Sequence, residues 1–151
     1  RDVTGVQTCA LPIWFLLLFL VVLLAFSATG CQFLERFAIE GVFKQLCDYV
    51  VLGGEEGVDG IVGLHIKDAK DEARMAYTIL DTLKFSKFQG QNTEIVINGN
   101  TAVLTTDIAW TRTNILNQTV SGVQERVEYK LKRVDFLEWK FIFSGDEDLS
   151  E

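Results

Sequence analysis

The chain has 151 residues, of which 48% are hydrophobic, and its formal net charge is −7 at pH 7. An acidic chain without a basic stripe does not fit a nucleic-acid-binding domain. No glycine-rich loop ending in Gly-Lys-Ser/Thr is present, so no phosphate-binding cofactor loop is predicted.

The first thirteen residues do not fit a native sequence. Residues 3–13, VTGVQTCALPI, resemble the translation of a standard short-read sequencing adapter. Read in this frame, the adapter leaves one final T. This base can be the first base of TGG, the codon of Trp14. The alternative is an unusual native leader peptide. We interpret residues 1–13 as adapter-derived and exclude them from the fold, which leaves Cys31 and Cys47 as the cysteines of the protein.

An apolar segment follows, from Trp14 to Phe26. A membrane-spanning helix needs about 20 apolar residues, so this shorter run is typical of the core of a signal peptide. It ends in the small residues Ser27-Ala28-Thr29-Gly30 and then Cys31. This ending resembles the lipobox of bacterial lipoproteins, although Ala28 stands where leucine is usual. The resemblance implies that residues 14–30 are removed and that Cys31 is lipidated.

The lipoprotein resemblance also implies a location. Gln32 rather than aspartate follows the cysteine, which implies the bacterial cell envelope, at the periplasmic face of the outer membrane. Two alternatives stay open: an uncleaved anchor that extends through Phe33-Leu34, and an incidental cysteine after an ordinary cleavage site. With Cys31 acylated, Cys47 is the one remaining thiol, so neither a disulfide nor a closed zinc site can form. Cys47 lies in a helical apolar pattern and is predicted to be a small buried hydrophobe.

Residues 31–144 are predicted to form one domain. From Phe33 to Leu52 apolar residues recur at intervals of three and four, which predicts a helix, and Gly53-Gly54 should end it. The acidic, glycine-rich stretch Glu55 to Gly63 is predicted to be a loop. Asp68 is the predicted N-cap of a second helix. The apolar face of that helix would hold Ala73, Ala76, Tyr77, Leu80 and Leu83.

After Gly90 the hydrophobic period becomes two. Four strands are predicted, at Glu94–Ile97, Ala102–Arg112, Gly122–Arg133 and Leu137–Ser144. Asn98-Gly99 predicts a tight hairpin turn between the first two strands. Residues 145–151, GDEDLSE, are predicted to be a solvated, disordered acidic tail. Helices followed by a curved, four-stranded antiparallel meander make an α+β domain.

The segments EIVINGNTAVLTTDIAW and LEWKFIF, in this order and spacing, resemble the nuclear transport factor 2-like superfamily. The resemblance covers roughly Phe33 to Phe143 and implies a cone-shaped fold; a cystatin-like arrangement is the alternative. Enzymes of that superfamily, such as polyketide cyclases, ketosteroid isomerases and scytalone dehydratases, place an aspartate or an Asp/His pair inside the cone as general base. No such catalytic set can be transferred here residue by residue.

Alternation along the strands predicts which side chains face the helices. On the third strand, Val123, Glu125, Val127, Tyr129 and Leu131 should form the inner face. One register places Arg112 opposite Glu125, and Asp107 opposite Lys130 on the outer face, which avoids like-charge pairs. That register predicts a ligand pocket, lined by Thr106, Trp110, Arg112, Glu125, Tyr129 and Trp139. The alternative is a rim ion pair, Arg112–Glu125, above a core of aromatic side chains.

Candidate acid–base residues are few. His65, the single histidine, is predicted near the loop before the second helix, where a structural role is more common than catalysis. Glu125 is the best remaining candidate base, with Tyr129 as a proton donor.

Three functions compete, and the fold alone does not choose among them. The first is a binding or assembly module held at the membrane by lipid on Cys31. Its cone would take a small hydrophobic ligand, or its sheet a partner such as a second copy of the chain. The second is a small hydrolase, isomerase or cyclase that uses Glu125. The third is a structural accessory subunit with a filled cone. Because no convincing acid–base pair is present, we favour the first.

Overall fold

The computed structural model describes residues 13–114 and 116–142, with side chains from residue 31 onward. The chain divides into two compact units, residues 1–34 and 35–151. Residues 1–12 of the predicted adapter-derived segment 1–13 and the predicted acidic tail 145–151 lie outside the described residues, as do the side chains of the predicted signal peptide. Among the residues with described side chains, no helical stretch is long and apolar enough to span a membrane.

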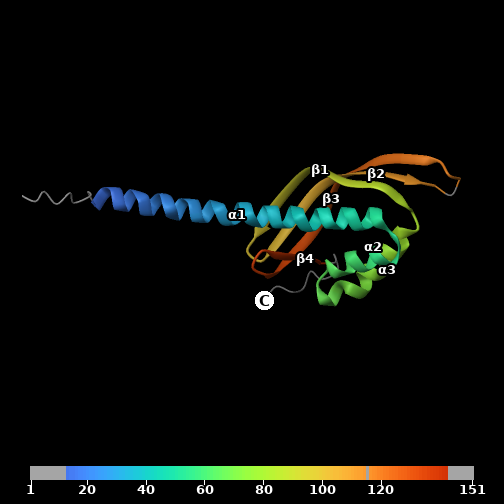
Figure 1. Ribbon diagram of the computed structural model, residues 1–151, viewed down its shortest axis with the longest axis horizontal. Coiled ribbons are helices and arrows are strands. Elements are labelled where there is room, and N and C mark those ends of the chain that lie inside the picture. The colour runs from blue at the N-terminus through green and yellow to red at the C-terminus, as the bar shows by residue number, and fades with distance from the viewer. Residues whose placement is uncertain (1–12, 115, 143–151) are drawn as a thin grey trace, which may run out of the picture. The chain divides into compact units, whose positions relative to one another are not determined.

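The described residues form three α-helices, one 3-10 turn and four strands. They are α1 (Ile13–Leu52), α2 (Gly54–Gly63), η1 (Lys67–Ala69), α3 (Lys70–Asp81), β1 (Phe85–Asn98), β2 (Thr101–Thr113), β3 (Thr119–Asp135) and β4 (Glu138–Ile142). The strands pair antiparallel in the order β1-β2-β3-β4. The sheet stays open, and the second half of α1 crosses it, with α2 and α3 beside the C-terminal end of α1 (Figure 1). The predicted α+β architecture is therefore confirmed.

One stripe of α1 and the inner face of the sheet form the core. On α1, Ile39, Phe43, Leu46 and Val50 recur at intervals of three and four and are buried, as expected for a helix that packs on one side. They pack against side chains of β2, β3 and β4: Leu104, Ile108, Leu131, Trp139 and Phe141. Cys47 lies in the same stripe and is buried, which confirms its prediction as a small hydrophobe.

The chain reverses after α1 at two glycines. Gly53 and Gly54 have φ values of 63° and 65°, a region that L side chains avoid, and they end the helix as predicted. The predicted loop at Glu55–Gly63 is wrong, because this stretch forms α2. A distant carboxylate explains the difference: Asp81, at the end of α3, accepts a hydrogen bond from the N–H of Gly54 at 2.7 Å. This bond satisfies one of the unpaired donors at the start of α2.

Other boundaries also differ from the prediction. Asp68 does not cap a helix, because it lies within η1, and α3 follows Ala69 without a side-chain cap. The first predicted strand is only the end of the longer β1. Asn98 pairs with Thr101, so the tight turn is centred on Gly99-Asn100, one residue later than predicted. Only Gly99 of these two has a positive φ, as in a type II′ turn.

The predicted register between β2 and β3 is wrong. Val120, not Glu125, lies opposite Arg112, and Val103 lies opposite Lys130. The β2–β3 turn lies earlier than predicted, with Thr113 opposite Thr119, which displaces the partner of Arg112 by five residues. A β-bulge in β3, where the register shifts opposite Thr106–Ile108 and Arg126 has a φ of 52°, changes this displacement by one residue, to four at Lys130. A bulge adds a residue to one strand and so inverts the alternation of its side chains beyond that point.

A second bulge lies directly across β2, in β1, where the register shifts between Gln91 and Glu94 and Asn92 has a φ of 52°. Asp107 on β2 holds both bulges. Its carboxylate accepts a hydrogen bond from Asn92 Nδ2 at 2.8 Å and another from the N–H of Arg126 at 2.9 Å. These two bonds, the Asn92 bond first, lower the pKa of Asp107.

The bulge in β3 determines which of the residues predicted for the inner face of the sheet pack toward the core. Val127, Tyr129 and Leu131 pack against or within the core, as predicted. Val123 and Glu125 are exposed instead.

Candidate functional site

The structure does not bring the six predicted pocket residues into one cavity. Glu125 and Thr106 line a polar depression at the two bulges, together with Asp107. The Thr106 hydroxyl donates to the Gln91 carbonyl at 2.8 Å. Thr106 therefore helps to hold the bulge in β1.

The other predicted residues are distributed along the inner face. Trp139 is 1% exposed and belongs to the core. The Arg112 guanidinium lies over the ring of Trp110, 5.2 Å from its centroid, and Trp110 covers Gly122, where an added Cβ would lie 2.6 Å from the indole. Tyr129 alone lines a cavity of a ligand-sized volume.

That cavity measures about 380 Å³ and lies beside β4, within the range of small-molecule sites. It is lined by His65, Tyr77, Glu128, Tyr129, Lys130, Phe141 and Ile142. Three of these side chains, His65, Tyr77 and Tyr129, come from the α2–η1 link, α3 and β3. We call these three residues the phenol–imidazole site.

His65 is placed by a short parallel bridge to Phe141. The N–H of Ile66 donates to the Phe141 carbonyl at 3.0 Å, and the N–H of Phe141 donates to the Leu64 carbonyl at 2.9 Å. The imidazole is 3% exposed, and its Nδ1 lies 2.9 Å from the Ile61 carbonyl. Because a carbonyl only accepts, Nδ1 carries the proton and the lone pair of the neutral ring lies on Nε2.

Aromatic contacts join the members of the phenol–imidazole site. The ring of His65 lies 5.7 Å from that of Tyr77 and 5.5 Å from that of Phe141. The ring of Tyr129 lies 5.8 Å from that of Phe141. On its other side Tyr129 contacts Phe43 of α1, at 5.2 Å. Phe141 thus bridges the imidazole and one phenol.

Burial keeps the titratable groups of this region uncharged. It lowers the pKa of His65 and raises the pKa of Tyr77 to about 12. It also raises the pKa of Tyr129, and it raises the pKa of the nearby Cys47 thiol to about 11. At neutral pH, His65 is therefore a neutral imidazole and both tyrosines are protonated. The site offers hydroxyl and imidazole groups against aromatic faces, and its charged residues are Glu128 and Lys130.

Sequence reasoning named Tyr129 but missed the other two members. The sequence predicts a structural role for His65 and a place on the apolar face of a helix for Tyr77. A lone histidine and a helical tyrosine carry no local signal for a shared site, because only the bridge to β4 brings them together. Among the described residues, no group of three or more His, Cys, Asp or Glu side chains could hold a metal ion.

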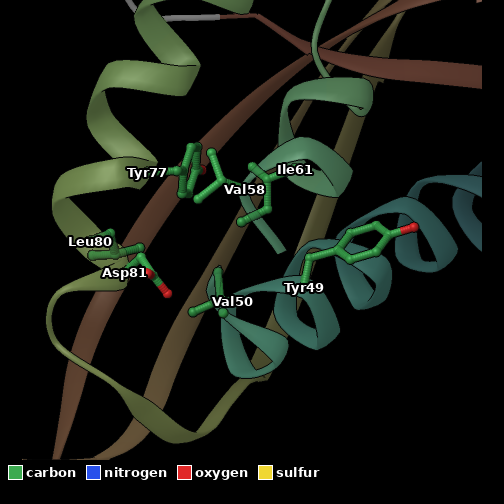
Figure 2. A pocket seen from close by; sticks show the side chains of 8 residues that line it. Tyr49, Val50, Val58, Ile61, Tyr77, Leu80 and Asp81 are labelled. Carbon is green, nitrogen blue, oxygen red and sulfur yellow. The ribbon is translucent and has the colours of Figure 1, made fainter. Parts of the chain in front are cut away.

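A second, much smaller cavity lies where the end of α1 meets α2 and α3. It measures about 10 Å³ and includes Val50, Val58, Tyr77 and Leu80 in its lining, which is room for about one water molecule. Figure 2 shows the hydroxyl of Tyr49 pointing away from the other lining side chains. This cavity is a packing junction rather than a ligand site.

No protein-family model matches the chain, and no curated protein matches it significantly. Among solved structures, the fold is similar to that of a variant of Rv3472, a protein of unknown function from Mycobacterium tuberculosis. The TM-score is 0.61 at 13% sequence identity, over 78% of this chain and 73% of that chain. A de novo designed β-sheet protein aligns over 81% of this chain and 94% of its own, with 16% identity and a TM-score of 0.31. At such low identity, the Rv3472 similarity concerns the fold alone.

Proposed function

We propose that the chain is a lipid-anchored module of the bacterial cell envelope that binds a small molecule at the phenol–imidazole site. In this proposal residues 14–30 are the signal peptide and Cys31 carries the lipid. Residues 31–144 form a nuclear transport factor 2-like domain. The helices that precede a four-stranded antiparallel sheet are compatible with that family. Cys31 is exposed on α1, as a lipidation site must be.

The observation that carries the proposal is the cavity of about 380 Å³ with neutral polar groups on aromatic walls. Pockets that bind small molecules are mostly apolar, with a few convergent polar groups that fix the orientation of the ligand. His65, Tyr77 and Tyr129 supply such groups without charge. We infer a neutral ligand with an aromatic or apolar body and one or two hydrogen-bonding groups.

The alternatives have less support. An enzyme that uses Glu125 as its base would need that carboxylate beside Tyr129, but Glu125 is exposed and lines a different depression. A structural accessory subunit would have no ligand-sized cavity at Tyr129. A second copy of the chain on the outer face of the sheet stays a prediction.

The first experiment is native mass spectrometry of the full chain, produced in a Gram-negative host and released from detergent. We expect a retained small molecule that is lost on denaturation. Tyr129→Phe removes one hydroxyl from the cavity. A hydrogen bond contributes about 1 kcal/mol, so this change should weaken binding roughly fivefold. Tyr49→Phe, which removes a hydroxyl outside the cavity, should leave the bound fraction unchanged.

Two results would contradict the proposal. A chain that carries no small molecule would favour the structural subunit. Equal retention by the wild type and Tyr129→Phe would mean that the ligand binds elsewhere.

A further inference from the structure

Three exposed apolar residues follow the two members of one ion pair closely in the sequence, at one end of the domain. Glu35 Oε1 on α1 and Arg133 Nη2 on β3 lie 2.5 Å apart. Phe37 lies two residues after Glu35, while Val134 and Phe136 lie one and three residues after Arg133. The side chains of Phe136, Phe37 and Val134 are 79%, 69% and 46% exposed.

Hydrogen bonds bring a second hairpin turn to the same end. The N–H of Arg133 donates to the Asn100 carbonyl at 2.8 Å, and its guanidinium donates to the Gly99 carbonyl at 3.3 Å. The β1–β2 and β3–β4 turns therefore lie together, and Figure 1 shows the β2–β3 turn at the opposite end of the sheet. We call this end of the domain, which carries the exposed side chains of Phe37, Val134 and Phe136, the anchor-proximal end.

We propose that the anchor-proximal end contacts the lipid bilayer, with these apolar side chains in the interfacial region. The inference rests on the proposed lipid at Cys31. Three residues lie between Cys31 and Glu35, and the four steps along the chain reach at most about 14 Å in any conformation. An acylated Cys31 therefore keeps this end of the domain close to the bilayer surface, whatever the orientation of the preceding segment.

The small size of the surface favours lipid over a protein partner. Two phenylalanines and a valine with these exposures offer roughly 350 Å² of apolar surface. A partner that covered all of it would bury roughly 700 Å² counted over both sides, whereas a specific protein interface needs about 1,000 Å² in total. A tethered surface, in contrast, meets the bilayer at high effective concentration, and aromatic and aliphatic side chains partition into the interfacial region of a membrane.

The test places a fluorescent probe at position 136. The full chain with Phe136→Cys is produced in a Gram-negative host, labelled with a polarity-sensitive maleimide dye and reconstituted into vesicles of phosphatidylethanolamine and phosphatidylglycerol. Cys47 is buried, so a chain with acylated Cys31 takes one dye. Leu116→Cys is the matched control, because Leu116 is also apolar, 71% exposed and next to a hairpin turn. The 17 residues of β3 separate the two positions by roughly 50 Å.

We expect a blue shift of the dye at position 136 and its quenching by nitroxide-labelled lipid, with neither effect at position 116. Phe37→Cys is a second probe of the same end and should show the same blue shift and quenching. It replaces Phe136→Cys if that variant misfolds. One dye per chain with a water-like spectrum at all three positions would overturn the proposed contact with the bilayer. The lipid anchor on Cys31 would still stand, and this end of the domain would be assigned to a protein partner. More than one dye per chain would overturn the anchor, and this inference with it.

Discussion

At the scale of single residues, desolvation sets the charge of the groups that face the concave side of the sheet. Cys47, His65, Tyr77 and Tyr129 each have a pKa shifted toward the neutral form, with burial as the largest cause. The carboxylates with lowered pKa values, Asp81 and Asp107, are held by hydrogen bonds near the surface instead. The interior of the domain is thus kept uncharged at neutral pH, which suits a neutral ligand.

His65 makes stability depend on pH. The unfolded histidine has a pKa of about 6.5, and the folded pKa is lower. Between these two values the unfolded state binds a proton that the folded state does not. The free energy of unfolding should therefore fall as pH drops from 7.5 to 5.5, by at most about 1.4 kcal/mol per pH unit. Urea denaturation at a series of pH values measures this slope.

His65→Gln should flatten the slope, since His65 is the single histidine of the chain. Asp81 and Asp107 have lowered carboxylate pKa values, so their protonation affects the free energy of unfolding below the ordinary aspartate pKa of about 3.9, outside this pH window. A slope that persists unchanged in His65→Gln would show that another group is responsible.

At the scale of elements, α2 depends on a carboxylate from another helix. Asp81 accepts from the N–H of Gly54 at 2.7 Å, which is the main cause of its lowered pKa, and contacts Lys84 at 3.3 Å. Asp81→Ala should cost about 1 kcal/mol, as for other N-caps, and should increase amide hydrogen exchange in α2 first. Lys84→Ala is the control, because its ion pair is exposed and should contribute at most about 0.5 kcal/mol. Equal losses in both variants would assign the effect to the ion pair.

The same element explains one limit of sequence-based prediction. The helix from residue 33 to Leu52 follows directly from the spacing of its apolar residues, and the four strands follow from alternation and turns. The stretch Gly54–Gly63 has four glycines and no side-chain cap from a neighbouring residue, so its sequence favours a loop. The cap comes from a residue 27 positions away, and only tertiary packing supplies it.

The candidate site was harder to predict for a related reason. Alternation placed Tyr129 correctly but also placed Glu125 inside, because the bulge at Arg126 has no glycine to signal it. The N–H of Arg126 donates a hydrogen bond to the carboxylate of Asp107 on the neighbouring strand, which stabilises that positive φ. His65 joins Tyr129 through a bridge to β4, a contact between residues far apart in the sequence. Local patterns contain neither interaction.

At the scale of the whole molecule, Arg133 connects α1 to the β1–β2 turn and to β4. Its guanidinium binds Glu35 of α1 and the Gly99 carbonyl of the β1–β2 turn, and it lies over the Trp139 ring, 5.0 Å from the centroid. The two charged side chains are 28% and 17% exposed. A planar guanidinium can stack and bind a carboxylate at once, which a lysine ammonium cannot do. Arg133 therefore fixes the start of the domain against the sheet.

A double-mutant cycle with Glu35→Gln and Arg133→Gln measures this connection. Exposed ion pairs couple by less than about 1 kcal/mol, whereas removing one partner of a buried pair costs about 3–5 kcal/mol. For this half-buried pair we expect a coupling of about 1–2 kcal/mol between those limits, from urea denaturation. The control cycle uses Arg74 and Asp59, which lie 2.6 Å apart with side chains 53% and 52% exposed. At nearly equal distance the two pairs differ mainly in burial, so equal coupling in both cycles would mean that Arg133 acts through Trp139 and the turn rather than through Glu35.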